Sequence, residues 1–141
     1  MTRVYVAAGL RRLVRERAQG RCEYCLAPDS VSFLPFEPDH IVAQKHGGAT
    51  DEGNLALCCS LCNKHKGSDL ASVDPESGEV VLLYHPRRDR WAEHLLLAAL
   101  RIEGASSRGR ATVRLLQLNR VERLEERALL VEAELWPFTP R

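Results

Sequence analysis

The sequence lacks an apolar run long enough to cross a membrane, and it carries almost no net charge. Its 20 lysines and arginines nearly balance 19 acids, so total charge gives no sign of a nucleic-acid-binding protein. The N-terminus has arginines but no apolar signal-peptide segment, and the chain has no internal repeats. With 45% hydrophobic residues among 141, we expect one globular domain over 1–141, soluble and cytoplasmic.

The charge is unevenly distributed along the chain. Residues 1–25 carry six arginines against two glutamates, whereas residues 26–60 carry one lysine against five acids. Local basic patches could therefore bind phosphates around an acidic centre. Many ordinary protein surfaces have a similar distribution, so charge alone does not distinguish a phosphate-binding surface from an ordinary charged one.

The sequence has five cysteines, and they are unevenly placed. Four of them form two Cys-x-x-Cys pairs separated by 33 residues: Cys22 with Cys25, and Cys59 with Cys62. An odd number arranged in this way is untypical of an exported disulfide scaffold and fits a reducing compartment. Two such pairs can close a tetrahedral zinc site, and four thiolates leave no position open for water. We therefore expect structural zinc rather than four buried free thiols, and we expect Cys58 to be a small buried residue.

The first half of the chain should contain two helices and two strands. The predicted elements are a helix over 9–19, a strand over 31–37 that continues at 39–43, a strand over 54–58 and a helix over 62–71. Gly20 suits a left-handed helix end, and Pro35 and Pro38 place the first strand at an edge. Gly47 and Gly48 mark the apex of the loop between the strands.

The second half should form a strand and helix extension over about 80–136. A strand is predicted over 80–86, and helices over 110–118 and 120–135. The segment 91–103 is ambiguous, because its length suits a helix but 98–103 could equally be a strand. In the last helix we expect one buried stripe, formed by Val121, Leu124, Ala128, Val131 and Leu135. A proline-rich tail follows over 136–141.

Four polar residues lie inside the frame of cysteines. Asp39 offers a hard oxygen ligand for a divalent cation, and the neighbouring His40 could accept a proton from water. Asn63, directly after the second cysteine pair, could be a second ligand for that cation. Asn54 could hold the tautomer of the imidazole. On a regular strand Asp39 and His40 point to opposite sides, but Pro38 could introduce a kink.

These residues resemble the HNH endonuclease family, in particular its zinc-bearing bacterial members. The similar segments are Cys22-Glu-Tyr-Cys25, Asp39-His40-Ile41-Val42, Gly47-Gly48, Asn54-Leu55-Ala56-Leu57 and the run from Cys59 to Gly67. The resemblance covers about 20–70. Segments of the extension, such as that from His85 to His94, resemble the C-terminal part of a small bacterial subfamily.

The resemblance implies an α+β fold with a ββα-metal core, and metal-dependent cleavage of DNA that leaves a 5′-phosphate and a 3′-hydroxyl. It implies that His40 is the general base and that Asn54 orients it. Asn63, where many members have a histidine, would bind Mg²⁺ or another divalent cation together with Asp39. The alternative is a catalytically inactive zinc module that binds DNA or protein.

Other polar residues near this centre are candidates for phosphate contacts or for an alternative cation ligand. Lys64, Lys66 and His46 could contact the phosphates of DNA. His65 could replace Asn63 as the ligand, although the residue directly after the cysteine pair fits better. One site per chain would need a homodimer, or two separate visits, to cut both strands.

Overall fold

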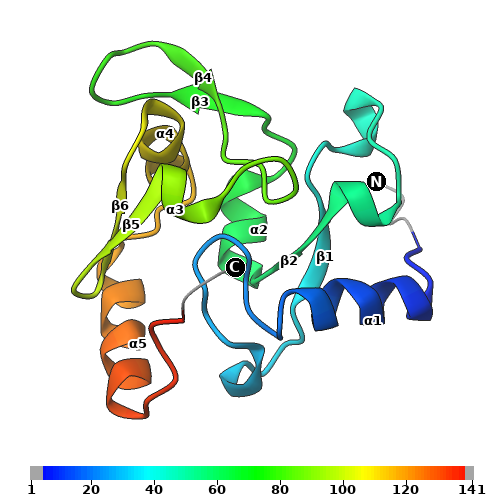
Figure 1. The fold of residues 1–141 in the computed structure, drawn as a ribbon, viewed down its shortest axis with the longest axis horizontal. Helices are drawn as coiled ribbons and strands as arrows, with labels where there is room; N and C mark the ends of the chain where they lie inside the picture. Colours follow the sequence, from blue (N-terminus) through cyan, green and yellow to red (C-terminus); the bar gives the residue numbers. More distant parts are fainter. Residues whose placement is uncertain (1–4, 139–141) are drawn as a thin grey trace.

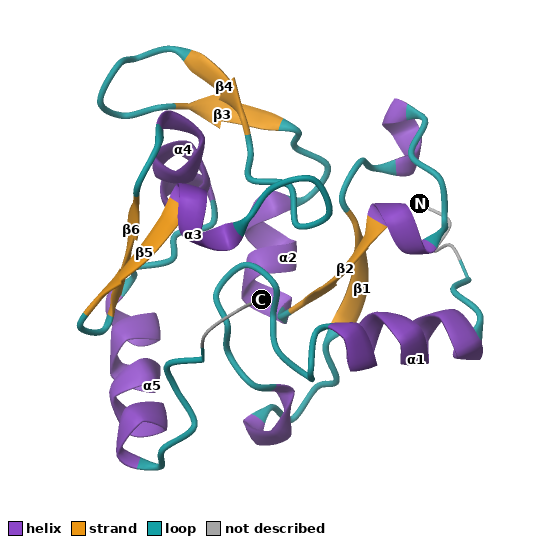
Figure 2. Cartoon of the chain, viewed as in Figure 1, coloured by secondary structure: helices purple, strands orange, loops and turns teal. Residues whose placement is uncertain are grey.

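The computed structural model describes residues 5–138, so the last residues of the expected proline-rich tail lie outside this range. Helices and strands are mixed, so the predicted α+β class is confirmed (Figure 2). The elements are α1 (Ala8–Arg17), β1 (Glu37–His40), β2 (Leu55–Cys58), α2 (Ser60–Lys66), β3 (Ala71–Val73), β4 (Val80–Leu82), α3 (Trp91–His94), β5 (Leu95–Ala98), β6 (Arg101–Gly104), α4 (Ser107–Leu115) and α5 (Val121–Glu132). Among these, none is a helix with the length and apolarity that a bilayer crossing requires.

Helix α1 packs against the β1–β2 pair, across one end of the two strands (Figure 1). Its Val14 is fully buried in a small cluster with Leu55 and Leu57 of β2. The helix ends at Arg17, and the chain turns away through Gln19 and Gly20, both with positive φ. The expected helix and its glycine end are thus confirmed, with the last helical residue two positions earlier than predicted.

Strands β1 and β2 pair antiparallel, with Asp39 opposite Ala56 and His40 opposite Leu55. The prediction of a strand from residue 31 is wrong, because a 3-10 turn covers Asp29–Val31 and regular pairing starts only at Glu37. Proline lacks the N–H that a strand ladder needs, and Pro35 lies in the unpaired segment. The pairing stays regular through Pro38, so the strand has no kink at Asp39.

Helix α2 follows β2 after Cys59, whose sulfur accepts a hydrogen bond from the Cys62 N–H. The helix stops before Gly67, which has φ +52°. The predicted helix over 62–71 is therefore too long at its end, and Ala71 already belongs to β3. An antiparallel strand pair followed by a helix thus carries the central polar residues.

The second half contains two further hairpins, β3–β4 and β5–β6, and the helices α3, α4 and α5 (Figure 1). Strand β4 ends at Leu82, earlier than expected, because the Tyr84 N–H bonds instead to the Thr112 hydroxyl of α4. The ambiguous segment 91–103 is one helical turn followed by a tight hairpin.

The prediction for the buried stripe of α5 is wrong. Val121 and Val131 are exposed, whereas Arg123, Arg127 and Leu130 are buried. Arginine normally stays at the surface unless its charge is paired, so hydrophobic periodicity alone could not identify this face. Arg123 contacts the sulfur of Cys62 in the first half of the chain, and Arg127 donates to the Leu100 carbonyl in the β5–β6 hairpin.

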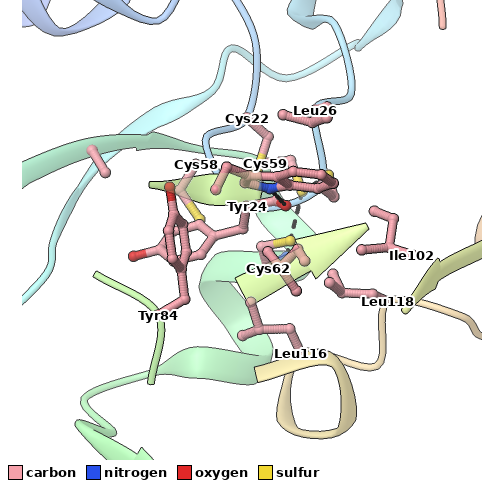
Figure 3. Packing of buried hydrophobic residues seen from close by; sticks show 14 of the residues in the cluster. Cys22, Tyr24, Leu26, Cys58, Cys59, Cys62, Tyr84, Ile102, Leu116 and Leu118 are labelled. Carbon is pink, nitrogen blue, oxygen red and sulfur yellow. Dashed lines mark hydrogen bonds between the residues drawn. The ribbon is translucent and has the colours of Figure 1, made fainter. Parts of the chain in front are cut away.

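One hydrophobic cluster joins the two halves of the chain (Figure 3). It contains the paired cysteines and Tyr24 together with Ile102, Leu116 and Leu118. The Trp91 indole N–H donates to the Tyr24 carbonyl at 3.0 Å, which ties α3 to the first cysteine turn. The extension therefore packs directly on the segment that holds the cysteines.

Candidate metal centre and active site

The four paired cysteines come together although 33 residues separate the pairs in sequence. Cys22 and Cys25 lie on a turn that closes when the Leu26 N–H donates to the Cys22 carbonyl at 2.9 Å. Cys59 and Cys62 lie at the start of α2. All four sulfurs are within 4.8 Å of one another.

The sulfur geometry fits a tetrahedral zinc ion. Zinc–sulfur bonds of about 2.3 Å place neighbouring sulfurs about 3.8 Å apart. The Sγ atoms of Cys25 and Cys59 are 3.7 Å apart. The four cysteines can therefore hold one metal ion such as zinc, and Cys58 is buried beside them without joining the group.

The thiols of this group do not ionise equally in the absence of a cation. Burial raises the pKa of Cys22 and of Cys62, whereas a hydrogen bond from Cys22 lowers the pKa of Cys25. Four thiolates packed in a buried space repel one another, so a bound cation must supply the positive charge that keeps all four deprotonated.

Arg123 of α5 lies beside the sulfurs, and sequence reasoning did not identify it. Its Nη2 atom lies 3.2 Å from the Cys62 sulfur and 3.7 Å from the Cys59 sulfur. Burial acts to lower the pKa of Arg123, but the neighbouring thiolates outweigh it and raise the pKa above its ordinary value. No local motif marks this arginine, because it belongs to a helix with many charges.

Asp39 points into the protein from β1, where its carboxylate is 6% exposed. Its Oδ2 atom lies 3.1 Å from the Lys66 ammonium and accepts a hydrogen bond from the Tyr24 hydroxyl at 3.3 Å. Burial raises the pKa of Asp39, and Lys66 acts in the opposite direction. Lys66, expected as a surface contact to phosphate, is instead 2% exposed and also donates to the His40 carbonyl at 3.2 Å.

His40 follows on the strand, and its ring points to a different partner. Its Nε2 atom is 2.8 Å from the Thr50 hydroxyl, in the loop between β1 and β2. Since the strand pairing is regular here, Asp39 and His40 lie on opposite sides of β1, and the alternative of a kink is wrong. Thr50 was not identified from the sequence, where it is one polar residue of a polar loop.

Asn54 holds this loop rather than the imidazole. Its amide nitrogen donates to the carbonyls of Val42 and Ala49, and its Oδ1 accepts from the Val42 N–H at 2.9 Å. The sequence predicted a direct hydrogen bond between Asn54 and the His40 ring. In the structure Asn54 bonds instead to the loop that carries Thr50. Asn54 fixes the backbone of the loop, and the loop presents Thr50 to His40.

The remaining candidates lie on or beside α2. Asn63 is half-buried, and Lys64 is exposed. His46 is exposed and bonds through Nε2 to the Ser68 carbonyl at 3.1 Å, next to the end of α2. His65, the alternative ligand, is 3.4 Å from the Gln117 amide and so faces the extension.

Residues 22–69 match the family model described as HNH endonuclease. The matched segment contains both cysteine pairs, β1, β2 and α2, and it confirms the resemblance seen in the sequence. No curated protein and no solved structure matches the chain.

Proposed function

Because residues 22–69 belong to the HNH endonuclease family, we propose that the protein is a metal-dependent endonuclease that hydrolyses phosphodiester bonds in DNA. The family match carries this proposal, since it spans the one segment that contains His40, Asn54 and Asn63. We also propose that β1, β2 and α2 form the ββα-metal core, that the four cysteines bind structural zinc, and that residues 1–141 form a single cytoplasmic domain.

His40 is the proposed general base. Its Nε2 atom meets the Thr50 hydroxyl at 2.8 Å, so a neutral ring that donates from Nε2 keeps the Nδ1 lone pair for a proton of water. Asn54 supports this arrangement by fixing the loop that carries Thr50.

Asp39 and Asn63 are the proposed ligands of the divalent cation, for example Mg²⁺. Carboxylate and amide oxygens suit such a cation, which would stabilise negative charge on the leaving oxygen. Lys66 lies three residues after Asn63 on α2, so the two share one helix face, and Lys66 reaches Asp39. Both Lys66 and Tyr24 contact Oδ2 of Asp39, which leaves Oδ1 as the proposed ligand atom.

Lys64 and His46 are the proposed contacts to the DNA backbone, because both are exposed near α2. Lys66 could contact DNA only if its side chain left Asp39. We therefore assign Lys66 to the ion pair with Asp39 and not to DNA contact. Since one active site cuts one strand at a time, cleavage of both strands needs a homodimer or two successive binding events.

Incubation of zinc-loaded protein with supercoiled plasmid, in a series of Mg²⁺ and Mn²⁺ concentrations, tests the proposal. We expect nicked or linear DNA only when the divalent cation is present. His40→Ala should lower the rate by about 10²–10⁴-fold. His65→Ala is the matched control on α2, and it should cut at the wild-type rate. Equal rates for the wild type and His40→Ala would contradict the assignment of the base.

The second candidate function is a catalytically inactive zinc module that binds DNA or protein. The Lys66 ammonium favours this alternative, because it already neutralises the carboxylate that the cation would need. Binding of DNA without cleavage at any Mg²⁺ or Mn²⁺ concentration would support the module and reject the nuclease.

A further inference from the structure

The side chain of Arg123 crosses from α5 to the second cysteine pair and is almost completely buried. One nitrogen, Nη2, contacts the sulfurs of Cys62 and Cys59, and the other, Nη1, donates to the Leu116 carbonyl at 3.0 Å. The guanidinium is thus held from both sides, with its donors directed at the thiolates.

The charge of a four-thiolate zinc site explains why a buried arginine suits this position. Four thiolates around Zn²⁺ leave a net charge of −2 in a space from which water is excluded. A buried charge is stable only when an opposite charge and hydrogen bonds compensate it. Arginine keeps its charge and offers several donors in a rigid plane, so Arg123 can provide both.

The first cysteine pair is held by the segment that follows α5. The Trp136 indole N–H donates to the Cys25 carbonyl at 3.3 Å, and both residues are buried. Arg21, directly before Cys22, donates to the Leu135 carbonyl. The chain end therefore contacts the turn of Cys22 and Cys25, while Arg123 contacts the sulfurs of the other pair.

We propose that residues 121–138 form a clamp on the metal centre, with Arg123 as a positioning residue for the metal-bound thiolates. The inference rests on metal binding by the four cysteines and does not depend on nuclease activity. Coupling between two binding events is reciprocal. The clamp therefore raises the affinity of the four cysteines for the metal, and the bound metal holds the clamp against the core.

Equilibrium competition for zinc with a colorimetric chelator tests the first half of the proposal. Residues that support metal ligands typically change metal affinity by about 10–100-fold, so Arg123→Met should bind zinc more weakly by about that factor. Arg123→Lys keeps the charge and should fall between Arg123→Met and the wild type. Arg120→Met is the control, because the Arg120 guanidinium is exposed and pairs with Glu122.

If Arg123→Met does not fold, Trp136→Phe provides an independent variant that removes the N–H donor to Cys25 and keeps an aromatic ring at this buried position. It should also bind zinc more weakly than the wild type, by a smaller factor. Wild-type affinity for zinc in Arg123→Met, or in Trp136→Phe where only that variant folds, would overturn the proposal. Metal analysis of the wild type separately checks the premise that zinc binds.

Hydrogen exchange of the zinc-loaded proteins tests the reciprocal half. In Arg123→Met, amides of α5 should exchange faster than in the wild type, while those of α1, which packs on β2 in a separate cluster, should not change. Unchanged exchange in α5, or an equal increase in both helices, would show that Arg123 is not a specific link between the metal centre and the clamp.

Discussion

Lys66 and Asp39 form an ion pair inside the protein, with 3% and 6% of their side chains exposed. Removing one partner of a buried pair leaves the other charge without compensation. We predict that Lys66→Met lowers the free energy of unfolding by about 3–5 kcal/mol, measured by urea denaturation.

Two further variants check this prediction. Lys64→Met, on the exposed side of the same helix, should leave stability nearly unchanged. The double variant Lys66→Met with Asp39→Asn should recover part of the loss, because the unpaired carboxylate is gone. A Lys66→Met protein as stable as the wild type would show that the pair contributes nothing.

The cysteines allow a second prediction, because five are buried but only four are grouped. Cys59→Ser should lose the metal and unfold, since zinc binding in small domains contributes roughly 10 kcal/mol or more to folding. Cys58→Ala should keep the metal and lose only the packing of one small side chain. Metal analysis and circular dichroism of both variants measure the outcome, and a folded Cys59→Ser protein that retains one zinc would contradict it.

At the residue scale the spacing of cysteines predicted which four thiols come together, because two residues between thiols let both reach one ion. The partners of the site were not predictable in this way. Lys66 and Arg123 belong to residue types that usually lie at the surface, and only the packed structure shows which buried charges they meet. Thr50 gave no signal at all within its polar loop.

Gly48, in the loop between β1 and β2, has no space for a side chain. A side-chain carbon at Gly48 would lie 1.7 Å from the Val42 carbonyl oxygen, which is also bonded by Asn54. We predict that Gly48→Ala displaces the loop, lowers thermal stability and reduces plasmid cleavage. Gly53→Ala is the control in the same loop, because its added carbon meets only the Asp51 side chain at 3.4 Å. Wild-type stability and cleavage in Gly48→Ala would contradict the steric argument.

The β3–β4 hairpin is fastened to α4 through Asp74, a fully buried acid. Its carboxylate accepts two hydrogen bonds of 2.9 Å from Arg110 and one from the Ser77 hydroxyl. The Arg110 bonds are the largest cause that lowers the pKa of Asp74 well below its ordinary value. The carboxylate therefore stabilises the fold above its unfolded pKa, and this contribution is lost as the pH falls toward the lower pKa of the folded state.

We predict that Asp74→Asn lowers the melting temperature by several degrees at neutral pH. The difference from the wild type should shrink as the pH falls below about 4, the ordinary pKa of an aspartate. Glu76→Gln is the control, because Glu76 contacts the same arginine from an exposed position. A difference that stays constant between neutral pH and about pH 3 would show that the charge of Asp74 is not the cause.

The elements themselves were predictable where local signals agreed. Helix α1 ends at a glycine turn as expected and buries Val14, whereas Leu13 is exposed. The segment 31–36 has the apolar composition of a strand, but within residues 5–138 it pairs with no strand and forms a turn and a loop. In α5 two arginines with hydrogen-bond partners inside the protein lie on the buried face, so apolar spacing gave the wrong face.

At the scale of the whole molecule, both halves of the chain contribute to the larger of two hydrophobic clusters. Tyr24 of the first half meets Tyr84 of the second edge to face, with ring centroids 6.2 Å apart. The cluster that contains the cysteines also contains Leu95, Leu116 and Leu130 of the extension. The larger cluster therefore needs residues of both halves, although the family match covers only residues 22–69.

We therefore predict that the zinc-loaded protein unfolds in one cooperative transition. The two tryptophans, Trp91 and Trp136, both lie in the second half and report its unfolding by fluorescence. Release of zinc to an indicator dye reports the first half, because both cysteine pairs lie there. The two signals should share one midpoint on heating and one midpoint in urea. Zinc release well before or after the fluorescence change would show two independent units, and an isolated segment 1–90 that folds and binds zinc would lead to the same conclusion.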